Sequence, residues 1–141
     1  MTTSSLGNST FIYNDNLKEL IIDGNITQLP ASMALECFSL KKVVLPNSLT
    51  IIEQYAFNNC YSIIDITIPS SVTSIANSAF SGCTSLTAIH FLSSTPPVLT
   101  NSQVFPTLPP NCIIYVPTGS LEAYTTATNY PSSSTYTYME E

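Results

Sequence analysis

Basic residues are nearly absent from this 141-residue chain. It contains no arginine, three lysines and one histidine, and its formal net charge is −6. A surface that binds nucleic acid needs a basic stripe to displace counterions from the phosphates. An anionic membrane surface attracts basic segments for the same reason. The composition therefore excludes nucleic acid as a partner and disfavours an anionic membrane.

Long apolar runs are also absent. No segment approaches the roughly 18 consecutive apolar residues of a spanning helix, so we expect no membrane insertion. The first residues, MTTSSLGNSTF, lack the basic start and apolar stretch of a secretory signal. Either the protein does not use that route or a signal was removed from this sequence. A Ser/Thr-rich, lysine-poor surface fits a cell-surface or secreted protein, although many cytoplasmic proteins share it.

What the chain does have is a repeat with a fixed step of 23 residues. The three clear copies are LKELIIDGNITQLPASMALECFS (17–39), LKKVVLPNSLTIIEQYAFNNCYS (40–62) and IIDITIPSSVTSIANSAFSGCTS (63–85). A step this short is typical of a solenoid, in which each unit buries its apolar face only by stacking on its neighbours.

Each copy opens with the pattern apolar-x-x-apolar-x-apolar, which predicts a short strand with alternating residues inward. Pro46 and Pro69 end two of these strands because proline removes a ladder donor. A second apolar pair follows, and then a small-aromatic-x-x-Cys segment, which we interpret as a single helical turn. Phe57 and Phe80 occupy the aromatic position, so we expect them to stack.

This pattern closely resembles the 23-residue leucine-rich repeats of the BspA-like class, approximately L-x-x-I-x-I-P-x-x-V-x-x-I-x-x-x-A-F-x-x-C-x-x. The match covers residues 17–92, and the copy at 63–85 fits nearly every position. The resemblance implies a parallel-stranded solenoid of a kind often found at microbial cell surfaces and active in adhesion. It implies no catalytic residues.

The fourth copy (86–112) is divergent because Pro96 and Pro97 replace the usual turn, so the chain must loop outward there. Residues 113–141 are expected to give a final strand, a capping helix after the N-cap Ser120, and a polar tail or short last strand. Residues 1–16 form either an N-terminal cap or the remnant of an earlier repeat. The predicted fold is a right-handed solenoid of about five coils, mostly β, with short parallel strands, single helical turns and a C-terminal capping helix.

Three of the four cysteines fall in the repeat column Cys37, Cys60 and Cys83. Zinc sites use ligand pairs two to four residues apart, and this chain has none, so we expect no metal site. We interpret the thiols as small buried core groups. A strained Cys60–Cys83 bridge, or pairing of Cys112 with a neighbour, remains open from the sequence alone.

The chain offers no catalytic constellation. His90, the single histidine, lies at an outward strand position without an evident nucleophile and carboxylate beside it. Glu19, Lys42 and Asp65 alternate in sign along one outward column and predict a cross-strand ion ladder. No glycine-rich phosphate loop or calcium loop is present. We therefore expect no enzyme activity, no catalytic residues and no cofactor.

One outward column is a candidate binding surface because it combines β-branched and aromatic side chains. It consists of Ile21, Val44, Thr67, His90 and Tyr115. Such residues anchor interfaces, although β-branched residues also simply favour strands. Two functions stay open: a non-catalytic adhesion module that presents a preformed sheet face to a protein or glycan partner, and a structural spacer or assembly module of a larger surface or fibre protein. In the second, oligomerisation would occur through the solenoid ends.

Overall fold

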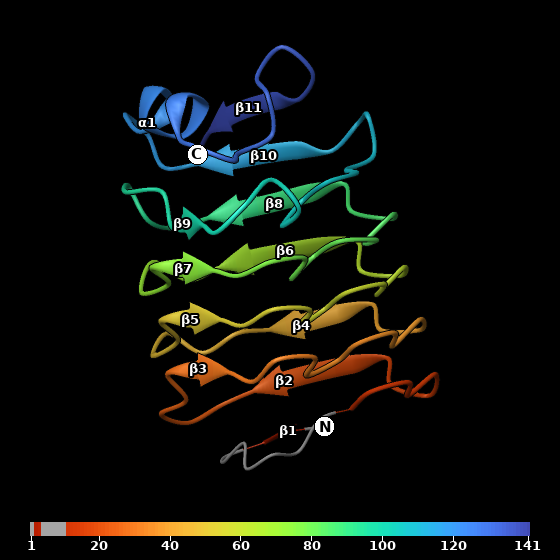
Figure 1. The fold of residues 1–141 in the computed structure, drawn as a ribbon. Helices are drawn as coiled ribbons and strands as arrows, with labels where there is room; N and C mark the ends of the chain where they lie inside the picture. The colour runs from red at the N-terminus through yellow and green to blue at the C-terminus, as the bar shows by residue number, and fades with distance from the viewer. Residues whose placement is uncertain (1, 4–10) are drawn as a thin grey trace.

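The computed structural model describes residues 2–3 and 11–141, and it is a stack of about five β-coils with one short helix near the C-terminus (Figure 1). This is the solenoid that the repeat predicted. Residues 1 and 4–10, which hold most of the N-terminal segment, lie outside the described residues.

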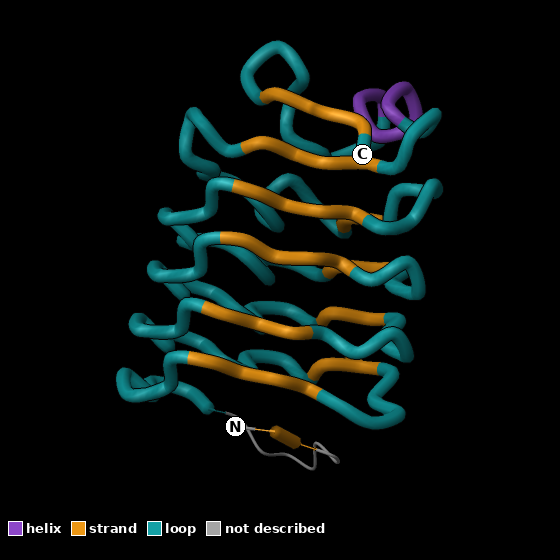
Figure 2. The backbone as a smooth tube through the Cα atoms, turned by 180° about the vertical axis from the view of Figure 1, so that it is seen from behind, coloured by secondary structure: helices purple, strands orange, loops and turns teal. Residues whose placement is uncertain are grey.

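Each coil contributes one strand to a parallel face, called the main sheet here, which faces the viewer in Figure 2; its strands form two separate hydrogen-bonded ladders, one of three strands and one of four. Its strands are β1 (Thr2–Thr3), β2 (Glu19–Ile22), β4 (Lys42–Val44), β6 (Asp65–Ile68), β8 (Ala88–Phe91), β10 (Ile113–Val116) and β11 (Thr137–Glu140). Register advances by one repeat per strand, so Asp65 lies beside Ala88 and Ile68 beside Phe91. Inward and outward residues alternate along β2, β4, β6, β8 and β10, as the apolar pattern predicted.

A second parallel sheet of two-residue strands crosses the other side of the coils. It contains β3 (Gln28–Leu29), β5 (Ile51–Ile52), β7 (Ser74–Ile75) and β9 (Val98–Leu99), joined in that order. Hydroxyl groups reinforce it: Thr50 Oγ1 donates to Thr27 O at 2.8 Å, and Thr73 Oγ1 donates to Thr50 O at 3.2 Å. The Ser/Thr-rich composition thus supplies hydrogen bonds between coils as well as solubility.

The core lies between the two sheets and is filled by the repeat columns. Phe80 stacks on Phe57 with 5.4 Å between ring centroids and on Phe105 with 5.2 Å. The predicted Phe57–Phe80 ladder is therefore present, and Phe105 extends it into the divergent copy. All three rings are buried, so this ladder joins the regular repeats to the segment after them.

Equivalent turns in successive coils share the same backbone conformation, although the residues at these positions differ. Tyr13, Glu36 and Asn59 have φ between 57° and 58°, and Gly82 continues this column at 80°. At Gly82 an added Cβ would lie 2.2 Å from Asn59 Oδ1, so glycine suits both the positive φ and the available space. The amide of Phe11 bonds Met33 O just as that of Ala34 bonds Ala56 O, so the same turn precedes the first clear copy.

The capping helix is present as α1 (Leu121–Thr126), with Ser120 at the predicted N-cap position. The Ser120 side chain forms no capping bond, because its Oγ donates back to Pro117 O at 2.5 Å. A carboxylate binds this end of the helix instead: Glu140 Oε1 accepts from the amides of Gly119 at 2.8 Å and Leu121 at 3.4 Å. The sequence concealed this because Glu140 reaches the helix only once β11 has paired with β10.

Tyrosine hydroxyls attach the C-terminal segment to the divergent copy. Tyr124 donates to Ser93 O at 2.7 Å, Tyr130 to Pro97 O at 2.8 Å and Tyr136 to Leu108 O at 3.2 Å. Burial raises the pKa of both the Tyr124 and Tyr130 hydroxyls, which keeps these donors protonated. No helix in the described part of the chain is long and apolar enough to cross a bilayer.

Candidate functional site

The predicted outward column occupies one face of the main sheet, in two groups. Ile21 lies beside Val44, and Thr67 lies beside His90, which lies beside Tyr115. Val44 is 40% exposed and Thr67 is exposed, whereas the other three side chains are half-buried. The two groups meet at Val44 and Thr67, where the sheet itself is interrupted.

This sheet break separates β4 from β6, which share no hydrogen-bonded ladder. Elsewhere the amide at the start of each strand bonds the coil below, as Lys41 N does to Lys18 O at 2.9 Å and Thr87 N to Ile64 O at 2.7 Å. Ile64 N forms no such bond to Lys41 O. At the other end, Leu92 N donates to Ile68 O at 3.1 Å, but the equivalent Pro69 has no N–H to donate. The ladder between β4 and β6 thus loses both terminal bonds.

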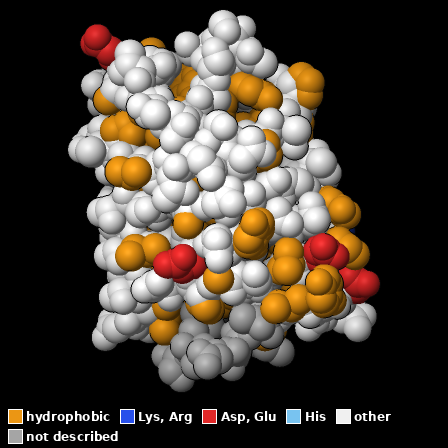
Figure 3. All heavy atoms as spheres, viewed as in Figure 1, with side chains coloured by type: hydrophobic (Ala, Val, Ile, Leu, Met, Phe, Trp, Pro, Cys, Tyr) orange, Lys and Arg blue, Asp and Glu red, His pale blue; other side chains and the backbone are white. Residues whose placement is uncertain are grey.

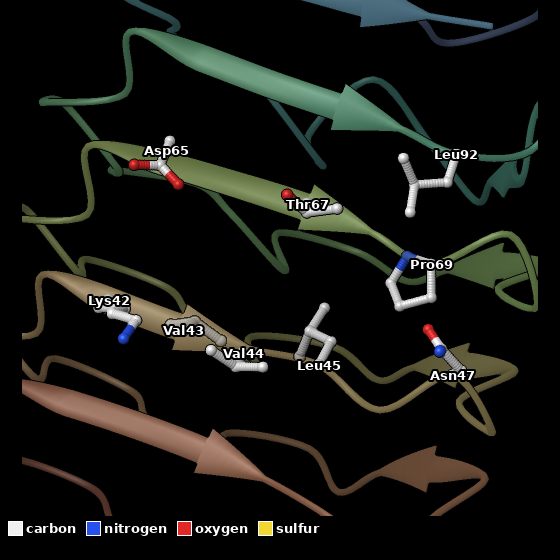
Figure 4. A pocket seen from close by; sticks show the side chains of 9 residues that line it. All are labelled: Lys42, Val43, Val44, Leu45, Asn47, Asp65, Thr67, Pro69 and Leu92. Atoms are coloured by element: carbon white, nitrogen blue, oxygen red, sulfur yellow. The ribbon is translucent and has the colours of Figure 1, made fainter.

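A pocket of about 400 Å³ opens at the sheet break (Figure 4). Figure 4 shows side chains from β4 and β6 around it, with Leu92 just after the end of β8. It is lined by Lys42, Val43, Val44, Leu45, Asn47, Asp65, Thr67, Pro69 and Leu92. Sequence analysis identified Val44 and Thr67 as candidate site residues but not the hollow between them, because repeat spacing alone predicts an unbroken sheet.

Charge around the pocket is uneven. Lys42 Nζ pairs with Glu19 Oε1 at 2.5 Å, and this hydrogen bond together with the lysine charge holds the pKa of the Glu19 carboxyl below its ordinary value. The side chain of Asp65, beyond the break, has no hydrogen bond or ion pair with any described residue. The predicted ion ladder is therefore present between Glu19 and Lys42 and stops before Asp65.

His90 acquires a partner that sequence reasoning missed. Its ring stacks on Tyr115 at 4.5 Å between centroids, and Nδ1 lies 2.9 Å and 3.1 Å from the two carboxylate oxygens of Glu141. Glu141 reaches this position because its amide bonds Val116 O directly after β11. No serine, threonine or cysteine side chain in the described ranges hydrogen-bonds His90. The arrangement orients an imidazole on the outer face but supplies no activated nucleophile.

The cysteine column lies in the core, and all four cysteines are free thiols. Cys37 Sγ donates to Phe11 O at 2.8 Å, Cys60 Sγ to Ala34 O at 3.1 Å and Cys83 Sγ to Phe57 O at 3.3 Å. Burial raises the pKa of the Cys83 thiol to about 12, so it stays protonated and unreactive at neutral pH. The described residues contain no group of three or more His, Cys, Asp or Glu side chains that could hold a metal ion.

Comparison with known proteins gives one family and three related folds. Residues 2–105 match the BspA type Leucine rich repeat region with 6 copies of the repeat. No curated protein matches the sequence. A leucine rich cell surface protein from Faecalibacterium prausnitzii A2-165 is 34% identical with a TM-score of 0.59, and the match covers 64% of this chain and 24% of that one.

Two further solved structures cover 94% of this chain. A leucine-rich repeat protein from Bacteroides ovatus ATCC 8483 is 25% identical with a TM-score of 0.65, and the pneumococcal vaccine antigen PcpA is 20% identical with a TM-score of 0.58. The match spans only 32% and 38% of those two proteins, and PcpA supports the fold alone. With the stacked coils, the repeat columns and a family match over most of its length, the chain belongs to the BspA type leucine-rich repeat family.

Proposed function

We propose that this chain is a non-catalytic binding module that presents the outer face of its main sheet to a protein or glycan partner. The observation that carries the proposal is the pocket at the sheet break, because it lies within the column of Val44 and Thr67. A hollow lined by apolar side chains with a few polar groups among them is a typical feature of a recognition surface.

The opposite face gives a useful contrast. Figure 3 shows that side, where apolar and acidic side chains are distributed over a largely uncharged polar surface and no lysine is visible. Lys42 lies instead beside the pocket on the main-sheet face. The proposed binding face is therefore the one on which a pocket, an ion pair and the aromatic stack of His90 and Tyr115 occur together.

One of the similar structures supports a location at the cell surface. The Faecalibacterium prausnitzii protein is described as a leucine rich cell surface protein, and this chain covers about a quarter of it. We propose the same environment here, with adhesion as the activity. No catalytic step forms part of the proposal, since His90 bonds only a carboxylate and the buried thiols are protonated.

The test is a pull-down from host-cell surface extract with three baits of equal thermal stability. The baits are the wild type, a face variant with Val44→Lys and Tyr115→Glu, and a control with the same changes at Val98→Lys and Tyr13→Glu. Val98 and Tyr13 are each 65% exposed. A partner kept by the wild type and the control but lost by the face variant supports the proposal. Equal capture by all three, or no capture at all, contradicts it.

A second candidate, a spacer or assembly module, is favoured by the end of the main sheet. β11 is the last strand, and Met139 within it is 45% exposed. Such an edge can pair with another chain. Assembly predicts that the molar mass in light scattering rises with protein concentration and that Met139→Lys, which places a charge on this edge strand, prevents the rise. A constant monomer mass contradicts assembly and leaves the binding module.

A further inference from the structure

We infer that the pocket at the sheet break receives a cationic side chain, lysine or arginine, from a protein partner. The inference rests on the proposed function and specifies its chemistry. It is drawn from three properties of the pocket: its size, the apolar character of its walls, and the uncompensated charge of Asp65.

The pocket is too small to receive an added β-strand, but its size suits a single side chain. The second sheet stays paired directly beneath the break, with Ile51 beside Ser74 and Ile52 beside Ile75. Turn bonds such as Phe57 N to Ala79 O, at 2.8 Å, also persist between the same coils. An inserted strand would need roughly 4.8 Å of extra separation, which these contacts prevent. The pocket of about 400 Å³ instead suits one long side chain with its flanking backbone.

The walls of the pocket match a side chain with an apolar stem and a polar head. Val44, Leu45, Pro69 and Leu92 supply apolar surface, and Leu92 is 48% exposed in the free protein. Lysine and arginine bury their methylene groups along such surfaces and keep the charged head at the edge. Figure 4 shows Asp65 at one end of the pocket and the apolar cluster of Leu45, Pro69 and Leu92 toward the other.

Charge decides between cationic and other head groups. Lys42 is already bound to Glu19, whereas Asp65 has no partner among the described residues, so the pocket offers an unsatisfied carboxylate. The chain as a whole carries −6, which attracts cations at a distance. No aromatic ring lines the pocket, so a sugar would find no flat surface on which to stack. These facts favour a basic side chain over a glycan or an anion.

The experiment titrates two blocked amino acids into ¹⁵N-labelled protein and follows the amide resonances of Val44 and Thr67 by NMR. N-acetyl-lysine methylamide is the cationic probe, and N-acetyl-norleucine methylamide has a similar stem without the charge. Asp65→Asn removes the pocket carboxylate, and Glu122→Gln on α1 is the matched control. Both acids are exposed, so neither variant should affect folding.

We expect the lysine probe to shift the pocket amides and to bind at least ~3-fold more weakly to Asp65→Asn, a change in the range of measured exposed ion pairs. Glu122→Gln should bind as the wild type does, and added salt should weaken binding. Equal binding of the two probes, or no effect of Asp65→Asn, overturns the inference. If the face variant Val44→Lys, Tyr115→Glu loses its partner while Asp65→Asn keeps it, the binding face stands and the cationic specificity fails.

Discussion

The regular coils (17–85) and the C-terminal region (86–141) differ in how each unit is joined to its neighbour. In the regular coils, backbone ladders and small side chains join each unit to the next, as when Ser71 Oγ donates to Leu49 O at 2.6 Å. In the C-terminal region the main sheet keeps its backbone ladder through β10 and β11, but the second sheet ends at β9. Long side chains take over there: Tyr130 donates to Pro97 O and Asn129 Nδ2 donates to Leu99 O, both at 2.8 Å.

The difference shows how a repeat ends. β9 is the last strand of the second sheet, and its outer carbonyls would otherwise be open to another chain. The Tyr130 phenol donates to the carbonyl of Pro97, directly before β9, and the Asn129 amide donates to that of Leu99 within it, so this edge is covered without a further strand. A repeat can therefore stop wherever side chains supply the donors that the next coil would have provided.

The largest expected effect concerns the ring ladder that joins the two regions. Phe80→Ala should cost about 3–5 kcal/mol of unfolding free energy, because it leaves a cavity between Phe57 and Phe105. Denaturant titration measures this. Phe38→Ala is the control, since Phe38 is 36% exposed, and should cost far less. A loss below about 1 kcal/mol at Phe80 would show that the ladder does not hold the stack together.

Removing two cap hydroxyls should loosen the C-terminal region selectively. Tyr124→Phe with Tyr130→Phe leaves the carbonyls of Ser93 and Pro97 without their donors, at a cost of about 1–3 kcal/mol in total. Hydrogen exchange should accelerate at Ile114 and Val116 in β10 more than at Ile66 in β6. Uniform acceleration along the chain would mean that the cap and the coils unfold as one unit.

As the pH is raised, we expect the buried thiol of the regular coils to lose its stabilising effect before the buried phenols of the C-terminal cap do. Burial raises the pKa of the Cys83 thiol from about 9 to about 12, so its stabilising effect is complete below pH 9 and is lost as pH rises toward 12. The cap phenols begin from an ordinary value of 10.0 and are also raised. Their contribution thus declines only above pH 10.

Chemical denaturation at pH 8, 9.5 and 10.5 should show stability falling by up to about 1.4 kcal/mol per pH unit for the thiol. Cys83→Ala should flatten the decline between pH 9 and 10. An unchanged slope in this variant would assign the alkaline loss to other groups.

Two glycines give a matched comparison across the regions. Gly82 and Gly119 have φ of 80° and 81°, but a Cβ at Gly82 meets Asn59, and one at Gly119 meets nothing within 4 Å. Gly119→Ala should cost about 1 kcal/mol from the backbone alone, and Gly82→Ala about 2 kcal/mol. Thermal denaturation of both variants measures the difference. Equal losses would mean that Asn59 moves aside freely.

The smallest effect is expected at the pair of His90 and Glu141. Glu141→Gln should cost less than about 1 kcal/mol, because both side chains are partly exposed. The informative readout is the imidazole resonance of His90, which should move because Nδ1 loses its carboxylate. An unchanged resonance would indicate that Glu141 does not hold the ring in solution.

The repeat made most of the fold predictable because 23-residue periodicity specifies which residues share a column. The inward positions, the Phe57–Phe80 stack and the buried column of Cys37, Cys60 and Cys83 follow from that period, whereas the capping helix was predicted from the local sequence after Ser120. The sequence also predicted which residues of the candidate column lie side by side on neighbouring strands. The role of this column in binding stays a prediction. Ser120 was predicted correctly as the N-cap position, but its missing side-chain bond and the contact of the distant Glu140 with Gly119 and Leu121 were not predictable.

What the sequence alone determined is thus the stacking: a fixed step and alternating apolar residues allow the chain to bury its side chains in only one way. The tertiary structure decided where the backbone ladder between stacked coils is interrupted. Local pattern cannot show that β4 and β6 separate, or that Glu141 returns to His90 across 51 residues. Both depend on the balance of backbone bonds and side-chain contacts between coils, which exists only once the coils are assembled.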